Sequence, residues 1–217
     1  MANRSLNMNS ESKFNPLIII AGASGSGKST LAKELSLRLS NFQVLNEDDF
    51  CFDRSFLLDR NSFYSLNHDL PSVVEHALAY SCLSKLLTGV SVEIPKYEHR
   101  TLSRSYGAKM NGGGGLIYEG LHVLHDSRIR ALASFTVFLT CNYETLAQRR
   151  LDRDRVSRGV CIDDPAEAYY KGVALPSYEK HVEPLKPLAD CLLDGECPKS
   201  EMVSIVLDNY AKKNSLC

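Results

Sequence analysis

A glycine-rich stretch with a single lysine offers the clearest chemistry in this chain. Residues 22–29 read GASGSGKS and fit the pattern G-x-x-x-x-G-K-[ST], directly after an apolar run and directly before a helical pattern. In such a loop, backbone N–H groups surround a phosphate, the lysine reaches the β- and γ-phosphates, and the following hydroxyl ligates Mg²⁺. The sequence therefore predicts a site for ATP with Mg²⁺, in which the phosphate-binding residues are Gly22, Ser24, Gly25, Ser26, Gly27, Lys28, Ser29 and Thr30.

Two other nucleotide-binding classes fit this stretch less well. A dinucleotide-binding loop, G-x-G-x-x-G, would need a third glycine where Thr30 stands. The chain also lacks the N-K-x-D and D-x-x-G elements of a GTPase. A small-molecule kinase, with a hydroxyl as phosphate acceptor, is the interpretation that these patterns favour.

Acidic residues follow two further apolar runs. Asp48 comes after the run 42–45, and Glu119 comes after the run 116–118. The carboxyl ends of parallel strands face the ligand crevice, so both carboxylates are expected near the phosphates. We expect Asp48 to activate the acceptor hydroxyl or face Mg²⁺, and Glu119 to hold Mg²⁺ through water, together with Ser29. The alternative for Asp48 is an acid that only caps a helix, and the alternative for Glu119 is an acid at a loop entrance without a chemical role.

Five arginines within ten residues predict a mobile segment that covers transferring phosphate. They are Arg149, Arg150, Arg153, Arg155 and Arg158, and Gly159 is a candidate hinge for a lid over 149–162. At helical spacing Arg149 and Arg153 share one face while Arg150 points elsewhere. The alternative is a solvated helix edge in which these arginines pair with Asp152 and Asp154.

The elements that must position these groups alternate between strand and helix patterns. Apolar runs predict buried strands, and 3.6-residue periodicity predicts helices between them, which indicates an α/β fold around a mostly parallel sheet of five strands. Residues 1–15 are expected to form a flexible tail before one domain over 16–217. The predicted strands cover 17–20, 42–45, 116–118, 135–139 and 189–193; the predicted helices begin near 28, at Pro71, and at 143, 165 and 199; a further β segment covers 90–94 and a loop covers 95–104.

Composition narrows the function classes. The 217 residues carry 25 basic and 26 acidic side chains, and 44% are hydrophobic, so we expect no nucleic-acid partner and no membrane surface partner. The longest apolar run, 17–21, is too short to span a bilayer, which predicts a cytoplasmic protein. The seven cysteines are scattered without metal-ligand spacing, which indicates free thiols.

Several segments together resemble the uridine kinase family, within the larger group that includes phosphoribulokinase and nicotinamide riboside kinase. The segments are GASGSGKST, EDDF, VEIPKYEHRTLSRS, LIYEG, FLTCNYETLAQRRLDRDRVSRG and YEKHVEPLKPLAD, which span roughly residues 16–195. The resemblance implies a P-loop NTPase-type three-layer α/β/α fold with a substrate-covering β-hairpin over 90–110. It also implies a homo-oligomer and a small-molecule nucleoside as substrate.

Residue roles follow from the same resemblance. It implies that Asp48 is the general base for the 5′-hydroxyl and that Asp69 holds the ribose hydroxyls. It implies further that Tyr97 contacts the base and that Arg104 lies in the substrate pocket. Arg149 is a further substrate-binding candidate, and Arg153 and Arg158 belong to the lid as catalytic arginines.

The chain departs from the family pattern at the base-reading end. The family hairpin usually reads Y-D-x-x-x-H-S-R, and Leu102 stands here in place of that histidine. His68 precedes Asp69 where nicotinamide riboside kinases have an aromatic residue, so it is a candidate to stack on a flat base. Three hypotheses stay open at this stage: a uridine or cytidine kinase, a kinase for nicotinamide riboside or another sugar hydroxyl, and a nucleotide-binding regulator without turnover.

Overall fold

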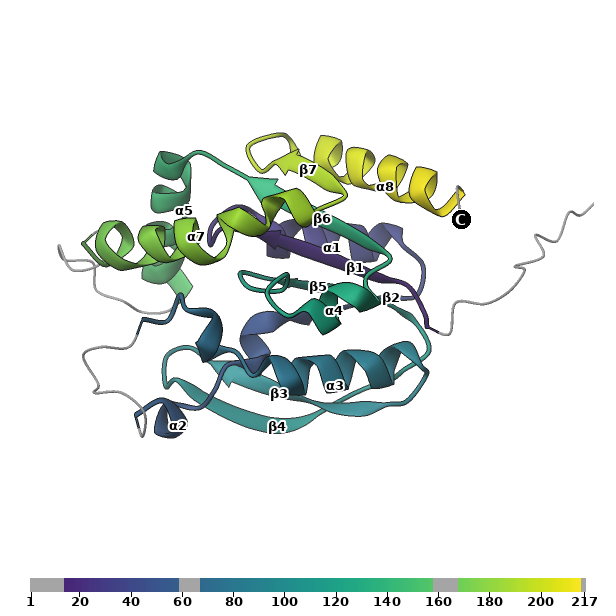
Figure 1. The fold of residues 1–217 in the computed structure, drawn as a ribbon, viewed down its shortest axis with the longest axis horizontal. Helices are drawn as coiled ribbons and strands as arrows, with labels where there is room; N and C mark the ends of the chain where they lie inside the picture. Colours follow the sequence, from purple (N-terminus) through teal and green to yellow (C-terminus); the bar gives the residue numbers. More distant parts are fainter. Residues whose placement is uncertain (1–13, 59–66, 158–167, 216–217) are drawn as a thin grey trace, which may run out of the picture.

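The computed structural model describes residues 14–58, 67–157 and 168–215 (Figure 1). Its strands are β1 Leu17–Gly22, β2 Phe42–Asn46, β3 Val92–Glu98, β4 Ser103–Met110, β5 Gly115–Gly120, β6 Phe135–Thr140 and β7 Cys191–Asp194. Its α-helices are α1 Lys28–Arg38, α2 Arg54–Leu58, α3 His76–Leu87, α4 Ser127–Leu132, α5 Tyr143–Ser157, α7 Leu175–His181 and α8 Lys199–Ser215. Short 3₁₀ turns cover Glu47–Phe50, Pro71–Val73 and Glu183–Leu188, and a π-helical turn covers Tyr170–Ala174.

The central sheet has five parallel strands in the order β2-β5-β1-β6-β7. Every residue of β1 is buried, as expected for a continuous apolar run with a helical layer on each face. The prediction of a mostly parallel five-stranded sheet is thereby confirmed. Because β1 lies between β5 and β6, the loop that follows β1 adjoins the ends of both neighbours.

Helices cover both faces of this sheet and make it the middle of three layers. Ile18 and Ile20 of β1 pack with the apolar sides of α1 and α8, while Leu17 and Ile19 pack on the other face with α3. This alternation follows from the two-residue period of a strand. Figure 1 shows α5 and α7 together at the end of the sheet toward which β1 runs, where the loop 22–27 also lies.

Strands β3 and β4 form a separate antiparallel hairpin, over the segment where the resemblance predicts one. The loop predicted over 95–104 is shorter than expected, since only residues 99–102 lie between the two strands. The pairing register shifts at Pro95, which has no N–H to contribute to a ladder and is accommodated at such an irregularity. Pro95 therefore lies within β3 instead of ending it.

The helix predicted from Pro71 begins later than expected. Pro71–Val73 forms a 3₁₀ turn, Val74 pairs as an isolated β-bridge with Cys51, and α3 starts only at His76. This pairing requires extended backbone at Val74, which delays the helix.

The amino-terminal boundary also differs from the expected one. Asn15, predicted to belong to the tail, donates its backbone N–H and its side-chain amide to the carbonyl oxygen of Leu87. Phe14 packs against the core. The remainder of the predicted tail, residues 1–13, lies outside the described residues. In the described part of the chain, every helix is too short or too polar to cross a bilayer.

Candidate active site

The loop between β1 and α1 has the shape needed to hold a phosphate. Gly25 and Gly27 have φ angles of 89° and 99°, in the left-handed region that favours glycine. Gly27 directly precedes the first turn of α1, so the helix N-terminus faces the loop. The residues predicted to bind phosphate, Gly22 and 24–30, thus extend from the last residue of β1 through the loop into the first turn of α1.

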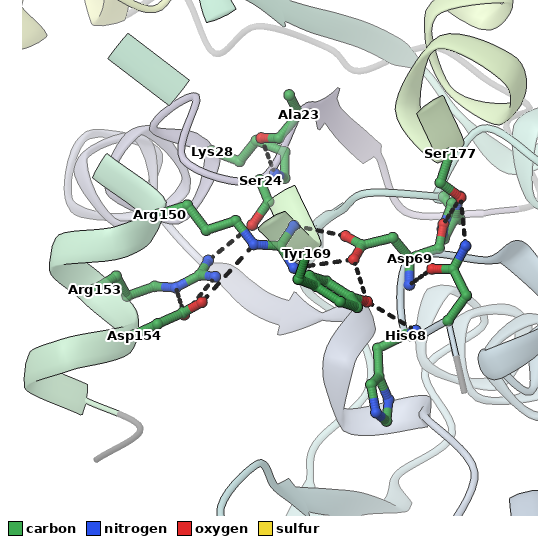
Figure 2. A network of polar contacts seen from close by, with 12 residues as sticks. Ala23, Ser24, Lys28, His68, Asp69, Arg150, Arg153, Asp154, Tyr169 and Ser177 are labelled. Atoms are coloured by element: carbon green, nitrogen blue, oxygen red, sulfur yellow. Dashed lines mark hydrogen bonds and ion pairs between the residues drawn. The ribbon is translucent and has the colours of Figure 1, made fainter. Parts of the chain in front are cut away.

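Lys28 lies across this loop. Its Nζ donates a hydrogen bond of 2.8 Å to the carbonyl oxygen of Ala23 (Figure 2). Burial lowers the pKa of Lys28, although the charges of Glu119 and Asp48 act in the opposite direction. The lysine therefore lies close to both acids predicted for the site.

The two acids reach the loop from neighbouring strands. Asn46 at the end of β2 pairs with Glu119 in β5, and its side chain accepts the N–H of Asp48 at 2.9 Å, which starts the 3₁₀ turn. Burial raises the pKa of Glu119, while Lys28 and a hydrogen bond from Ser29 lower it.

These groups fit a magnesium ion bound together with a nucleotide. Mg²⁺ is usually held by one or two carboxylates, with substrate phosphates and water completing its shell. The Ser29 hydroxyl already contacts Glu119, and Asp48 lines the same cavity, so all three are oxygen donors at one place. The described residues contain no group of three or more histidine, cysteine, aspartate or glutamate side chains that would hold a metal without the nucleotide.

A cavity of about 510 Å³ extends from the phosphate loop to the hairpin tip and α5. Its volume lies within the range typical of small-molecule sites. The predicted site residues that line it are Ser24, Lys28, Ser29, Asp48, His68, Asp69, Tyr97, Glu119 and Arg153.

Asp69 forms the densest polar network in this cavity (Figure 2). Arg150 of α5 donates from Nη1 to Oδ1 at 2.7 Å and from Nη2 to Oδ2 at 2.9 Å. The Tyr169 hydroxyl donates to Oδ2 at 2.9 Å and accepts the backbone N–H of His68 at 3.2 Å. Burial alone would raise the pKa of Asp69, but the hydrogen bonds and charge of Arg150 outweigh it and lower that pKa. Asp69 is therefore an ionised carboxylate fixed in position.

A second arginine connects this network to the phosphate loop. Arg153 donates from Nη1 to the Ser24 hydroxyl at 3.0 Å and from Nη2 to Asp154 at 2.9 Å. Asp154 also lies 3.8 Å from Nε of Arg150. Asp154 thus links one arginine of α5 that lies beside the phosphate loop and one that lies beside Asp69.

The contact between Arg150 and Asp69 was not predicted from the sequence, where Arg150 was expected on a different helix face from Arg149 and Arg153. Arg150 precedes Arg153 by three residues and Asp154 by four, and these spacings share a helix face. This spacing could have indicated from the sequence that Arg150 lies on the same face of the helix as Arg153. Tyr169 had no comparable signal, because its contact with Asp69 joins residues 100 positions apart.

The loop at the tip of the β3–β4 hairpin approaches Asp48, the candidate general base. His99 Nε2 lies 3.1 Å from Oδ2 of Asp48, and its ring packs edge-on against Tyr97 with centroids 5.2 Å apart. Leu102, which adopts a φ of 52°, lines the same cavity. His99 therefore lines the cavity beside Asp48, although it was not among the site residues predicted from the sequence.

Two predicted arginines lie outside the cavity lining, and the position of a third is not described. Arg104 donates to Glu75 Oε2 at 2.7 Å and is not among the residues that line the cavity. Arg149 is likewise absent from that lining and donates to the Gly195 carbonyl oxygen at 3.0 Å. Arg158 lies outside the described residues, as does all of the predicted lid beyond residue 157, including the candidate hinge Gly159.

Two buried residues, Glu47 and His122, connect the 3₁₀ turn that carries Asp48 to the backbone of Asp69. Glu47 Oε2 accepts the backbone N–H of His122 at 2.7 Å, and His122 Nε2 donates to the carbonyl oxygen of Asp69 at 3.1 Å. Burial raises the pKa of Glu47 to about 8, and burial together with His76 lowers the pKa of His122 to about 3. Burial therefore favours the neutral form of both groups.

A phosphate loop on a five-stranded parallel sheet, with acids at the ends of adjacent strands and arginines on α5, defines a P-loop kinase. Proteins of this class transfer a phosphoryl group to a hydroxyl acceptor.

Comparison with known proteins narrows this class. The family model described as "Phosphoribulokinase / Uridine kinase family" matches residues 17–196, and the chain belongs to that family. It is 34% identical over 184 residues to a uridine kinase from Proteus mirabilis, covering 82% of this chain and 85% of that protein. It is 28% identical to uridine kinase-like protein 5 from Arabidopsis thaliana over 93% of this chain, and it spans only 44% of that longer protein.

A solved structure shows the same fold. The putative fructose transport system kinase from Silicibacter sp. TM1040 superimposes with a TM-score of 0.70 at 23% identity, covering 86% of this chain and 93% of that one.

Proposed function

We propose that this protein transfers the γ-phosphate of ATP to the 5′-hydroxyl of a nucleoside, with uridine or cytidine as the acceptor. The observation that carries the proposal is that Lys28, Asp48 and the Asp69–Arg150 pair all line the same cavity. Such a cavity brings a polyphosphate and a polyhydroxyl acceptor together. The uridine kinase relatives support the choice of acceptor.

In the proposed mechanism the chain positions both reactants. The loop amides and Lys28 bind the β- and γ-phosphates, and Ser29, Glu119 and Asp48 would hold Mg²⁺. When bound there, the ion would supply charge neutralisation at the phosphates. Asp69, which Arg150 fixes, binds the ribose.

Asp48 then accepts the proton of the 5′-hydroxyl as its oxygen attacks the γ-phosphorus. The bond from the γ-phosphorus to the β,γ-bridging oxygen breaks, and ADP leaves with the electron pair. Arg153, which lies within reach of the phosphate loop through Ser24, neutralises the charge that develops on the transferring group.

The test measures ADP release with uridine, cytidine, nicotinamide riboside and ribulose 5-phosphate as acceptors. We expect release with uridine or cytidine, and Asp48→Asn should lower kcat by roughly 10²- to 10⁴-fold, the usual effect of a general base, while ATP still binds through the phosphate loop. Asp208→Asn, an exposed acid on α8, is the matched control. Near-normal kcat in Asp48→Asn would contradict the role of the base, and absence of release with every acceptor would contradict the function.

A second acceptor class is favoured by one feature of the cavity. His68 and Leu102 both line it, and Leu102 has no group to hydrogen-bond a pyrimidine. Preference for nicotinamide riboside over uridine in the same assay would establish this alternative, a kinase for another ribosyl or sugar hydroxyl.

A further inference from the structure

Asp69 has fewer free lone-pair positions for substrate hydroxyls than a carboxylate without hydrogen-bond partners would have. An ionised carboxylate offers about four lone-pair positions. Arg150 occupies one position on Oδ1 and one on Oδ2, and Tyr169 occupies the second position on Oδ2. Among the bonds made by the described residues, a single position therefore remains, on Oδ1.

Tyr169 is held firmly where it makes this bond. Its hydroxyl accepts the N–H of His68 while it donates to Asp69, so both of its hydrogen-bonding functions point into the network. Its ring lies 5.6 Å from the guanidinium carbon of Arg150. Burial, followed by the nearby Asp69 charge, raises the pKa of Tyr169, which keeps the donating proton in place.

The backbone of Asp69 is fixed as well. Its carbonyl oxygen accepts from Ser177 Oγ at 2.7 Å and from His122 Nε2 at 3.1 Å, and its N–H donates to Asn67 Oδ1 at 2.9 Å. The side chain of Asp69 is only 7% exposed. The carboxylate therefore cannot turn to expose Oδ2 without breaking several bonds.

We infer that the Tyr169 hydroxyl takes the place of one substrate hydroxyl at Asp69, so that this carboxylate binds a ribosyl acceptor through one hydroxyl and tolerates loss of the other. The inference rests on the proposed function and specifies its acceptors: ribonucleosides and one class of deoxyribonucleosides. Tyr169 is thus a specificity-determining residue, supplied by the segment just before α7.

The experiment compares kcat/KM for uridine, 2′-deoxyuridine and 3′-deoxyuridine in the wild type and in Tyr169→Phe. In the wild type, one deoxy analogue should stay within about tenfold of uridine, because only one sugar hydroxyl contacts Asp69. Tyr169→Phe frees a position on Oδ2 for the second hydroxyl of uridine. The ratio of uridine to that analogue should then rise by roughly tenfold or more, the usual effect of a hydrogen bond to a charged group.

Tyr178→Phe, which removes a hydroxyl from α7, is the matched control and should leave the ratio unchanged. The KM for ATP and the melting temperature verify that each variant is folded, and Tyr169→Met provides a second variant without the hydroxyl. Rejection of both deoxy analogues by more than a hundredfold in the wild type would overturn the inference. An unchanged ratio in both Tyr169 variants would also overturn it, and either result leaves the proposed function standing. A wild type that phosphorylates none of these three nucleosides, and none of the acceptors in the panel of the proposed function, overturns both.

Discussion

Two buried carboxyl groups near the cavity have opposite ionisation states, and each state has a visible cause. Asp69 is ionised because Arg150 compensates for its burial. Glu47 lacks a cationic partner at bonding distance among the described residues, and its Oε1 has no hydrogen-bond partner there. Its burial therefore favours the protonated form.

The protonated state of Glu47 makes stability depend on pH. The pKa of Glu47 is about 8 in the folded state against an ordinary value of 4.5. The folded state therefore keeps a proton that the unfolded chain releases, and this contribution is complete below pH 4.5 and lost as the pH rises through 8. Glu47→Gln, which mimics the protonated group, should gain stability relative to the wild type between pH 5 and pH 8, on the order of 2 to 4 kcal/mol.

Urea unfolding of the nucleotide-free protein at pH 5, 6.5 and 8 measures this difference. Glu201→Gln, an exposed side chain on α8, should show no such trend. A difference between Glu47→Gln and the wild type that stays constant with pH would show that Glu47 is ionised in the folded state.

Among the elements, the β3–β4 hairpin is joined to the 3₁₀ turn Glu47–Phe50 through the side chain of Asp49. Asp49 follows Asp48 in the 3₁₀ turn, and its Oδ1 accepts the backbone N–H of Tyr97 at 3.2 Å. Asp49 also pairs with Lys96 at 3.0 Å, but the Lys96 side chain is 70% exposed. An ion pair so exposed contributes little, so the bond to the backbone is the important one.

Asp49→Ala should therefore loosen the hairpin that carries Tyr97 and Leu102. We expect KM for the acceptor to rise by about tenfold, equivalent to one hydrogen bond, with little change in KM for ATP. Lys96→Ala removes only the exposed ion pair and should leave both KM values near those of the wild type. Steady-state kinetics on the two variants would test this, and equal effects in both, or a larger effect on ATP, would contradict the assigned role of Asp49.

At the scale of the whole molecule, nucleotide binding should stabilise the fold, because the phosphate loop joins the central strand to α1. A ligand at 100 times its Kd adds about 2.7 kcal/mol. For a domain of this size this corresponds to roughly 5 to 11 °C in Tm. We expect this shift with Mg²⁺ and the β,γ-imido analogue of ATP.

Lys28→Ala should abolish most of the shift, and Lys33→Ala, an exposed lysine on the same helix, should retain it. Thermal unfolding with and without the nucleotide measures both. A full shift in Lys28→Ala would show that the nucleotide binds elsewhere.

The sequence by itself determined the features that depend on neighbours along the chain. The phosphate loop, the buried strand before it and the helix after it are encoded within residues 17–38, and the structure has all three there. The acids Asp48 and Glu119 could be placed at strand ends because parallel strands share one carboxyl edge. Local backbone preference and periodicity suffice for such features.

Only the tertiary structure decided which side chains meet across the cavity. Arg150, and not Arg149, reaches Asp69, because the direction in which α5 leaves the sheet selects the face that turns inward. Likewise, Tyr169 meets Asp69 and His99 meets Asp48 through segments far apart in sequence. The physical reason is that such pairs depend on how helices and hairpin pack on the sheet. Spacing within one segment shows which residues share a face, but it does not show which face packs inward or what it meets there.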